Sequence, residues 1–315
     1  MKSVQSTELS LSKADYDQSA RLRQRLTTIH TACFALARTF PHRLVPYLCK
    51  KLASALLPPI RGCVITPTVF GFDICVTCGA GENYYYLGFY ELGTLRMMEN
   101  ILAPGDSFVD VGASEGQMSA RASQLVGNSG HVIALEPQGQ RFHDLVNTIH
   151  LNGFSNITPL RLGASSAAGE ARLYTDIVSP TLRQTKNVSR FETVEVRRLD
   201  DVLAGQDAGN VTMIKIDVEG FELEVLRGAA NTVSRDYAPI LCVEVGIQDV
   251  GHREVADILS EYNDYRIYRL SRTKSCYSKL IPVDRCENLS HHDNIFCLPA
   301  RRLADLPPSL FSNRS

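Results

Sequence analysis

The residues best suited to chemistry lie in a glycine turn that follows an apolar run. Residues 108–111 (Phe-Val-Asp-Val) are expected to form a buried strand, and Gly112-Ala113-Ser114-Glu115-Gly116 leads into a helix. Such a turn lets a ligand approach the backbone, and the helix N-terminus offers N–H groups to an anion. Glu136 ends the next apolar run about 20 residues later, where an acidic residue accepts hydrogen bonds from ribose hydroxyls. The spacing predicts a site for a nucleoside-containing cofactor.

The glycine spacing and one carboxylate select among such cofactors. A nicotinamide dinucleotide requires glycine at the first, third and sixth positions of the turn, where this chain has Gly112, Ser114 and Gln117. Asp110 would repel a pyrophosphate but suits an ammonium group. We therefore expect S-adenosylmethionine, with Asp110 facing its ammonium and Glu136 holding its ribose. The helix N-terminus from Ser114 to Gly116 would face its carboxylate.

A second segment places two carboxylates beside a glycine turn. Asp217 and Glu219 follow the apolar run that ends at Ile216, and Gly220 comes next. Crowded like charges raise a carboxyl pKa, which suits a general base. The pair could instead cap the following helix and orient the cofactor, or hold a divalent cation. His143 and His252 are weaker candidates for the base. The lone C-x-x-C at 75–78 has no second pair at zinc spacing, so we predict no metal there.

The elements that must position these residues alternate between strand and helix patterns. The alternation predicts a doubly wound, mostly parallel α/β sheet, with ligands outside the carboxyl ends of the strands. Gly163 and Ala164, after the third strand, therefore join the cofactor candidates, and Glu244, in the fifth strand, lies at the same edge. The expected core strands are Ser107–Val111, His131–Leu135, Ile157–Leu162, Met213–Asp217 and Ile240–Val245, with a hairpin from Ala171–Tyr174 and Thr193–Arg197 and a terminal pair from Tyr265–Arg269 and Asn294–Leu298.

Composition and patterning outline the rest of the chain. Residues 1–60 are expected to form a basic helical extension, which would cap the main domain or dock on a membrane surface or partner. Residues 61–300 form the main domain and begin with a small β segment, and 301–315 form a tail. The 315 residues have a net charge of −1, which gives no argument for nucleic-acid binding. No secretory signal or run of about 20 apolar residues is present, so we expect a cytoplasmic protein.

Several motifs together resemble a known family. Residues 110–116 (DVGASEG), 135–137 (LEP) and 215–228 (KIDVEGFELEVLRG) are similar to the FkbM-type S-adenosylmethionine-dependent methyltransferases. Tyr90-Glu91-x-x-Thr94 and residues 294–299 extend the resemblance over about residues 60–300. It implies a Rossmann-like class I methyltransferase fold and methyl transfer to a hydroxyl on a sugar, polyketide, glycolipid or related metabolite. Family members usually have Asn-Ile at positions 114 and 115, where Glu115 would lie beside the methionine carboxylate or point to solvent.

A non-enzymatic alternative remains. The chain could be an inactive cofactor-binding or partner-binding domain whose basic N-terminus docks on a membrane or protein. The joint presence of Asp110, Glu136, Asp217 and Glu219 favours an enzyme. Product formation from S-adenosylmethionine separates the two hypotheses.

Overall fold

The computed structural model describes most of the main domain and a short part of the N-terminal region. The described residues are 11–20, 62–78, 90–175, 180–183, 190–206, 210–246, 250–272, 274, 278–283 and 292–312. The predicted helical extension over 1–60 therefore lies largely outside the described residues. Residues 84–87, whose sequence favours a short strand in the small β segment, also lie outside them. Within the described residues, no helix is both long and apolar enough to span a membrane.

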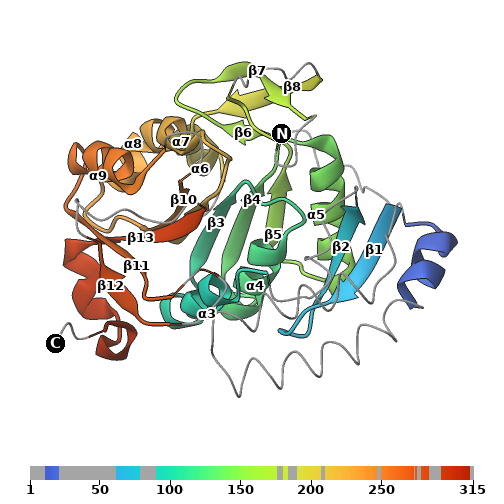
Figure 1. Cartoon of the computed structure of the whole chain (residues 1–315), viewed down its shortest axis with the longest axis horizontal. Coiled ribbons are helices and arrows are strands. Elements are labelled where there is room, and N and C mark those ends of the chain that lie inside the picture. Colours follow the sequence, from blue (N-terminus) through green and yellow to red (C-terminus); the bar gives the residue numbers. More distant parts are fainter. Residues whose placement is uncertain are drawn as a thin grey trace.

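An eight-stranded sheet forms the centre of the molecule (Figure 1), in the order β12-β11-β13-β10-β9-β3-β4-β5. The neighbouring strands β10, β9, β3, β4 and β5 are parallel to one another. Beside β10, the strands β13, β11 and β12 follow in that order, and each is antiparallel to its neighbour. The bounds are β3 Ser107–Val111, β4 His131–Leu135, β5 Ile157–Leu160, β9 Val211–Ile216, β10 Ile240–Val245, β11 Tyr265–Leu270, β12 Leu280–Pro282 and β13 Asp293–Pro299. The predicted doubly wound, mostly parallel fold is confirmed.

Helices cover both faces of this sheet because its strands are apolar on both sides. In β3, Val109 and Val111 pack in one core cluster, whereas Phe108 packs in the other. The first cluster is covered by α6 Leu199–Ala204, α7 Glu222–Gly228, α8 Ala230–Val233 and α9 His252–Ser260. The second is covered by α3 Leu92–Ile101, α4 Gln117–Val126 and α5 Gly139–Asn152. Residues 221–235, whose sequence pattern favours a single helix, are divided into α7 and α8.

Two small sheets flank the core (Figure 1). The hairpin of β1 Gly62–Pro67 and β2 Asp73–Cys78 packs on α5, where Thr148 Oγ1 accepts a 3.0 Å hydrogen bond from the N–H of Cys75. The helix at residues 13–20 is tied to β1 by a 2.9 Å bond from the N–H of Ile65 to Ser19 Oγ. The second sheet contains β6 Gly163–Ala164, β7 Gly169–Tyr174 and β8 Phe191–Arg197, so the predicted hairpin forms.

The C-terminal residues belong to the same core. Two 3-10 helices, Ala300–Asp305 and Pro308–Leu310, follow β13. Leu306 and Leu310 are buried in the core cluster that α3 covers, and Phe311 bridges to Leu280 of β12. The described part of the predicted tail is therefore packed against the main domain.

Candidate active site

A pocket opens at the carboxyl ends of the parallel strands, where the order of connection reverses between β3 and β9. This switch point is where open α/β sheets bind ligands. Nine of the ten predicted site residues line the pocket: Asp110, Gly112, Ala113, Ser114, Glu136, Gly163, Ala164, Asp217 and Glu219. The structure thus brings together residues from four separate segments of the chain, although their individual roles remain predictions.

The two glycines of the first turn allow close packing around the pocket. Gly112 has φ +85°, and a Cβ there would lie 1.9 Å from the backbone oxygen of Asp217. Gly116, the predicted residue that does not line the pocket, has φ +88°, and its Cβ would lie 2.5 Å from Cδ1 of Leu145. Only glycine adopts this backbone without strain. Gly112 therefore lets β3 and β9 meet beneath the pocket, and Gly116 seats α4 against α5.

Glu136 holds the turn and the end of β4 together. Its carboxylate accepts a 2.9 Å bond from the N–H of Ser114 and a 2.8 Å bond from the N–H of Gln138. Burial raises the pKa of Glu136 to about 7, against the charge of Arg141 and these hydrogen bonds. A carboxylate has about four acceptor positions, so two remain for a ligand. Glu136 is therefore suited to the two hydroxyls of a ribose.

Glu115 does not point to solvent, contrary to one expectation from the sequence. It is 7% exposed and lines the pocket, where its carboxylate accepts a 2.5 Å bond from Ser114 Oγ. Burial raises its pKa. Arg141 donates to the same Ser114 hydroxyl at 3.0 Å. The Arg141 guanidinium therefore lies beside the turn at Ser114, where its charge partly offsets the buried carboxylates of Glu115 and Glu136.

Two of the three N–H groups predicted to receive the cofactor carboxylate are already engaged. That of Ser114 donates to Glu136, and that of Gly116 donates to the carbonyl oxygen of Ala113 at 2.8 Å. The start of α4 therefore presents fewer free donors than its sequence suggested. The reason is that Ser114 adopts φ +50°, which turns its N–H toward β4.

Asp110 and Gln117 both contribute acceptor oxygens to the pocket lining. Asp110 is 1% exposed and accepts a 2.6 Å bond from Ser119 Oγ, and burial raises its pKa to about 6. The side-chain oxygen of Gln117 is buried without a hydrogen-bond partner among the described residues, while its nitrogen donates to the carbonyl oxygen of Tyr90. An unpartnered buried acceptor is costly. A donor group of a ligand bound in the pocket, such as an ammonium, would satisfy it.

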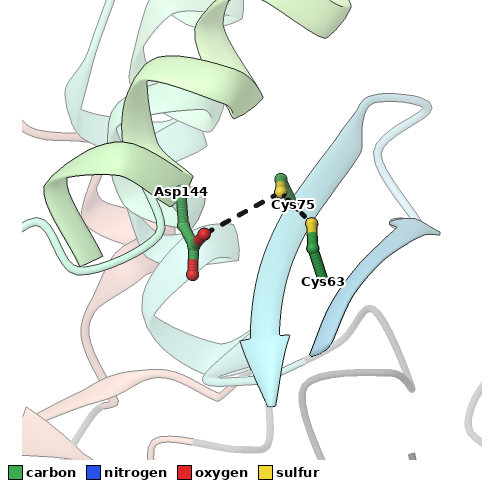
Figure 2. Close-up of side chains that lie close together, drawn as sticks. All are labelled: Cys63, Cys75 and Asp144. Carbon is green, nitrogen blue, oxygen red and sulfur yellow. Dashed lines mark hydrogen bonds between the residues drawn. The ribbon is translucent and has the colours of Figure 1, made fainter. Parts of the chain in front are cut away.

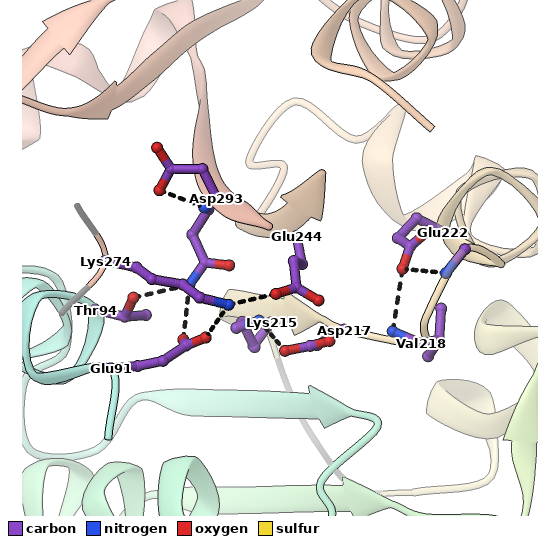
Figure 3. Close-up of polar contacts among 11 residues, drawn as sticks. Glu91, Thr94, Lys215, Asp217, Val218, Glu222, Glu244, Lys274 and Asp293 are labelled. Atoms are coloured by element: carbon purple, nitrogen blue, oxygen red, sulfur yellow. Dashed lines mark hydrogen bonds and ion pairs between the residues drawn. The ribbon is translucent and has the colours of Figure 1, made fainter. Parts of the chain in front are cut away.

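Three carboxylates and two lysines gather at the ends of β9 and β10 (Figure 3). Lys215 donates to Asp217 at 2.9 Å, and the ammonium of Lys274 lies 2.6 Å from Oε1 of Glu91 and is also ion-paired with Glu244. Carboxylate oxygens of Glu91, Asp217 and Glu244 lie within 4.8 Å of one another, a spacing that a cation could bridge. The Lys274 ammonium already bridges Glu91 and Glu244, so the described residues neutralise much of this cluster themselves.

The carboxyl groups of this cluster differ in how readily they bind a proton. Burial opposes ionisation of Asp217, but the ammonium groups of Lys215 and Lys274 hold its pKa well below the usual range. Burial and the charge of Asp217 raise the pKa of Glu244 to about 9. Of these two neighbouring carboxyl groups, Glu244 therefore has the stronger affinity for a proton.

Glu219 lies on the rim of the cluster in a strained turn. It has φ +55°, and its backbone oxygen accepts a 2.7 Å bond from Thr181 Oγ1. Glu222 is fully buried and accepts bonds from the N–H groups of Val218 and Gly220 (Figure 3). Glu222 thus fixes the turn that presents Asp217 and Glu219 to the pocket.

The sequence motifs predicted no chemical role for Glu91, Lys274 or Asn294. Asn294 donates to Glu91 at 2.7 Å and to Thr94 Oγ1 at 2.8 Å, across about 200 positions of the chain. The motif Glu91-x-x-Thr94 and the segment starting at Asn294 are therefore two parts of one contact. Glu91 also has φ +49°, unusual for a non-glycine residue. No local pattern identifies Lys274.

Comparison with known proteins decides the family. The profile of the methyltransferase FkbM domain matches residues 110–267, half of the chain. The chain belongs to the FkbM methyltransferase family. The match spans Asp110, Glu136 and the Asp217–Glu244 region, so most of the pocket lining lies within the matched domain.

Similar proteins include one curated enzyme and several solved structures. The chain is 25% identical over 172 residues to the hexuronic acid methyltransferase AglP of Haloferax volcanii, covering 54% of this chain and 68% of AglP. A methyltransferase FkbM from Methylobacillus flagellatus is 20% identical with a TM-score of 0.44, covering 68% of this chain but only 52% of that one. An S-adenosylmethionine-dependent O-methyltransferase from Thermotoga maritima is 13% identical with a TM-score of 0.41, covering 79% and 97%. The chain thus spans about half the length of the solved FkbM protein.

Family membership confirms S-adenosylmethionine as the cofactor of this FkbM methyltransferase domain. The pocket fits its polar groups. Glu136 keeps acceptor positions for the ribose hydroxyls. Asp110 and the unpartnered Gln117 oxygen suit the ammonium. These three residues are the ones we would assign to cofactor binding.

Proposed function

We propose that this FkbM methyltransferase transfers a methyl group to a hydroxyl of an uncharged small molecule, such as a sugar, polyketide or glycolipid headgroup. One observation carries the proposal: a single pocket joins Asp110 and Glu136 to the proton-binding cluster at Glu244. Bound S-adenosylmethionine supplies an activated methyl on a sulfonium. The protein then has to orient the acceptor hydroxyl and take its proton, which is worth about 10²–10⁴-fold in rate.

The acceptor is expected at the β9–β10 side of the pocket. The strand order places Glu136 at the end of β4, two strands from Asp217 at the end of β9 and three from Glu244 in β10. If Glu136 holds the ribose, the acceptor lies at the opposite side, beside Glu91, Asp217, Glu219 and Glu244. Asp217 and Glu219 remain candidates for positioning the hydroxyl.

Glu244 is a better candidate than Asp217 for receiving the acceptor proton. Asp217 is bonded to Lys215 and its pKa is lowered, so it is a weak base. Glu244 has a raised pKa and lines the pocket. The Lys274 ammonium beside it stabilises the ionised form that must exist before the proton arrives.

The charge of the pocket favours an uncharged acceptor. Its described lining has seven acidic residues and two basic ones, Arg141 and Lys215. Arg141 donates to Ser114, and Lys215 is paired with Asp217. An acidic acceptor would therefore meet net repulsion, because these cations are already paired with groups of the protein. We accordingly expect this enzyme to prefer a neutral hexose over the hexuronic acid named for AglP.

The test is transfer of labelled methyl from S-adenosylmethionine to matched acceptors. Purified protein is incubated with a methyl hexoside and with the corresponding methyl hexuronide, and the products are separated and counted. We expect product with the hexoside, at least about tenfold less with the hexuronide, and loss of turnover in Glu244→Gln. The variant Glu170→Gln, an exposed carboxylate on β7 outside the pocket lining, is the control.

The same assay addresses the inactive-domain alternative. Retained binding of S-adenosylhomocysteine with no methyl transfer to any hydroxyl acceptor would contradict the proposed function and favour a binding domain. Preference for the hexuronide would contradict only the inference drawn from pocket charge.

A further inference from the structure

The β1–β2 hairpin carries two cysteines whose sulfur atoms nearly touch (Figure 2). Cys63 Sγ and Cys75 Sγ are 2.7 Å apart, on the two paired strands. In the antiparallel register Cys63 faces Thr77 and Ile65 faces Cys75, so the cysteines are diagonal neighbours. Residues two positions apart along a strand share a face, which directs both side chains to the same side of the hairpin.

This spacing is too short for two thiols in ordinary contact and too short for two zinc ligands. Thiolates bound at about 2.3 Å to a tetrahedral zinc ion lie nearly 4 Å apart. Asp144, the third residue of this group and its one carboxylate, is also engaged elsewhere. Its carboxylate accepts 2.8 Å bonds from both the N–H and the hydroxyl of Thr77, and a 3.3 Å bond from Gln140. A metal ion would have to break these bonds.

We propose that Cys63 and Cys75 are an oxidation site that forms an intramolecular disulfide. The two cysteines are separated by 12 positions, and their Sγ atoms need to approach by less than 1 Å to reach the bonded distance of about 2.05 Å. The site is distinct from the methyl-transfer pocket and does not depend on its assignment. It is also not the C-x-x-C pair of Cys75 and Cys78 that the sequence suggests first.

The two sulfurs have different environments, which sets the order of the steps. Cys63 is partly exposed, whereas Cys75 is buried, with its sulfur 3.9 Å from an oxygen of Asp144. The hydrogen bond with Cys63 and burial raise the pKa of the Cys75 thiol. Cys63 is therefore the sulfur that a small-molecule disulfide reaches first.

The reaction is thiol–disulfide exchange with glutathione disulfide as the oxidant. The Cys63 thiolate attacks one glutathione sulfur, breaks its S–S bond and releases one glutathione thiolate. The Cys75 sulfur then attacks Cys63 in the mixed disulfide, gives up its proton to water and releases the second glutathione. The two cysteines lose two electrons, and glutathione disulfide gains them.

The experiment maps cysteine pairing in the full-length folded protein after incubation with glutathione disulfide. Free thiols are alkylated under denaturing conditions, and the chain is cleaved before Asp73, which separates Cys63 from Cys75 and Cys78. We expect a cross-link between the fragments in wild type and in Cys78→Ser, and none in Cys75→Ser or Cys63→Ser. Cys297→Ser, in β13, controls for loss of a buried cysteine.

Thermal unfolding of the same samples gives an independent readout. A cross-link within the hairpin should raise the Tm of oxidised wild type and Cys78→Ser, and treatment with a reductant should reverse the shift. Alkylation of both Cys63 and Cys75 after oxidation of folded wild type would overturn the proposal. A cross-link that is lost in Cys78→Ser would overturn it equally, because it would assign the bond to Cys78.

Discussion

Replacing Glu136 with glutamine should weaken cofactor binding without unfolding the protein. The carboxylate holds the N–H groups of Ser114 and Gln138 with one oxygen each, at 2.9 and 2.8 Å. Glutamine keeps one oxygen and replaces the other with an NH₂ group, which cannot accept. The variant therefore loses one backbone contact and acceptor capacity for the ribose.

The size of the effect follows from the kind of bond lost. A hydrogen bond to a charged group contributes about 1.5–3 kcal/mol net. Losing one such bond to a ribose hydroxyl corresponds to about a 10- to 100-fold rise in Kd. Because burial raises the pKa of Glu136 to about 7, the folded protein already tolerates an uncharged group at this position. We thus expect a small loss of stability beside a large loss of affinity.

Isothermal titration with S-adenosylhomocysteine measures this directly. Wild type, Glu136→Gln and the exposed control Glu170→Gln are titrated at one pH above 8, where Glu136 is ionised, and their Tm values are compared. We expect the control to match wild type. A Kd for Glu136→Gln within about twofold of wild type, in a protein with an unchanged Tm, would refute the assignment of Glu136 to the ribose.

Three further predictions concern the same pocket. Asp110→Asn keeps a partner for Ser119 but removes the charge facing the ammonium, so the Kd for S-adenosylhomocysteine should rise about tenfold in titration, and an unchanged Kd would reject this role. Gly112→Ala, whose Cβ would lie 1.9 Å from the Asp217 oxygen, should abolish cofactor binding and lower the Tm. Gly105→Ala has a similar φ of +93°, but its Cβ would meet only Ser129 Oγ at 3.8 Å, an ordinary contact. It should lower the Tm only, so equal effects would contradict the close approach at Gly112. Because burial and Asp217 raise the pKa of Glu244 to about 9 and a base must be ionised, kcat should rise with pH toward 9 in wild type. A flat profile between pH 6 and about 9 would exclude Glu244 as the base.

Much of the fold followed from local patterns. The apolar runs of β3, β4, β9 and β10 are continuous because both faces of a parallel sheet are covered, and the glycine turn after β3 marks the switch point. The terminal antiparallel pair β11 and β13 was also predictable. The insertion of β13 between β10 and β11 was not, because strand order depends on long-range packing.

The site was predictable where motif and strand end coincide, as at Asp110, Glu136 and Asp217. It was not predictable where a contact joins distant segments. Lys274 reaches Glu91 and Glu244 from a region without a local motif. The conformation of Ser114 is a similar case, since its φ of +50° turns the N–H to Glu136 and removes it from the expected anion site. Both the ion pairs of Lys274 and the conformation of Ser114 depend on contacts between segments that are distant in the sequence.

We propose that the pocket between the ends of β3, β4 and β9 binds S-adenosylmethionine through Asp110 and Glu136. A crystal structure of the protein with S-adenosylhomocysteine tests it most directly. We expect ribose hydroxyls within hydrogen-bond distance of Glu136, and the ammonium beside Asp110 and the Gln117 oxygen. A cofactor bound elsewhere, or bound in this pocket with its ribose away from Glu136, would contradict it.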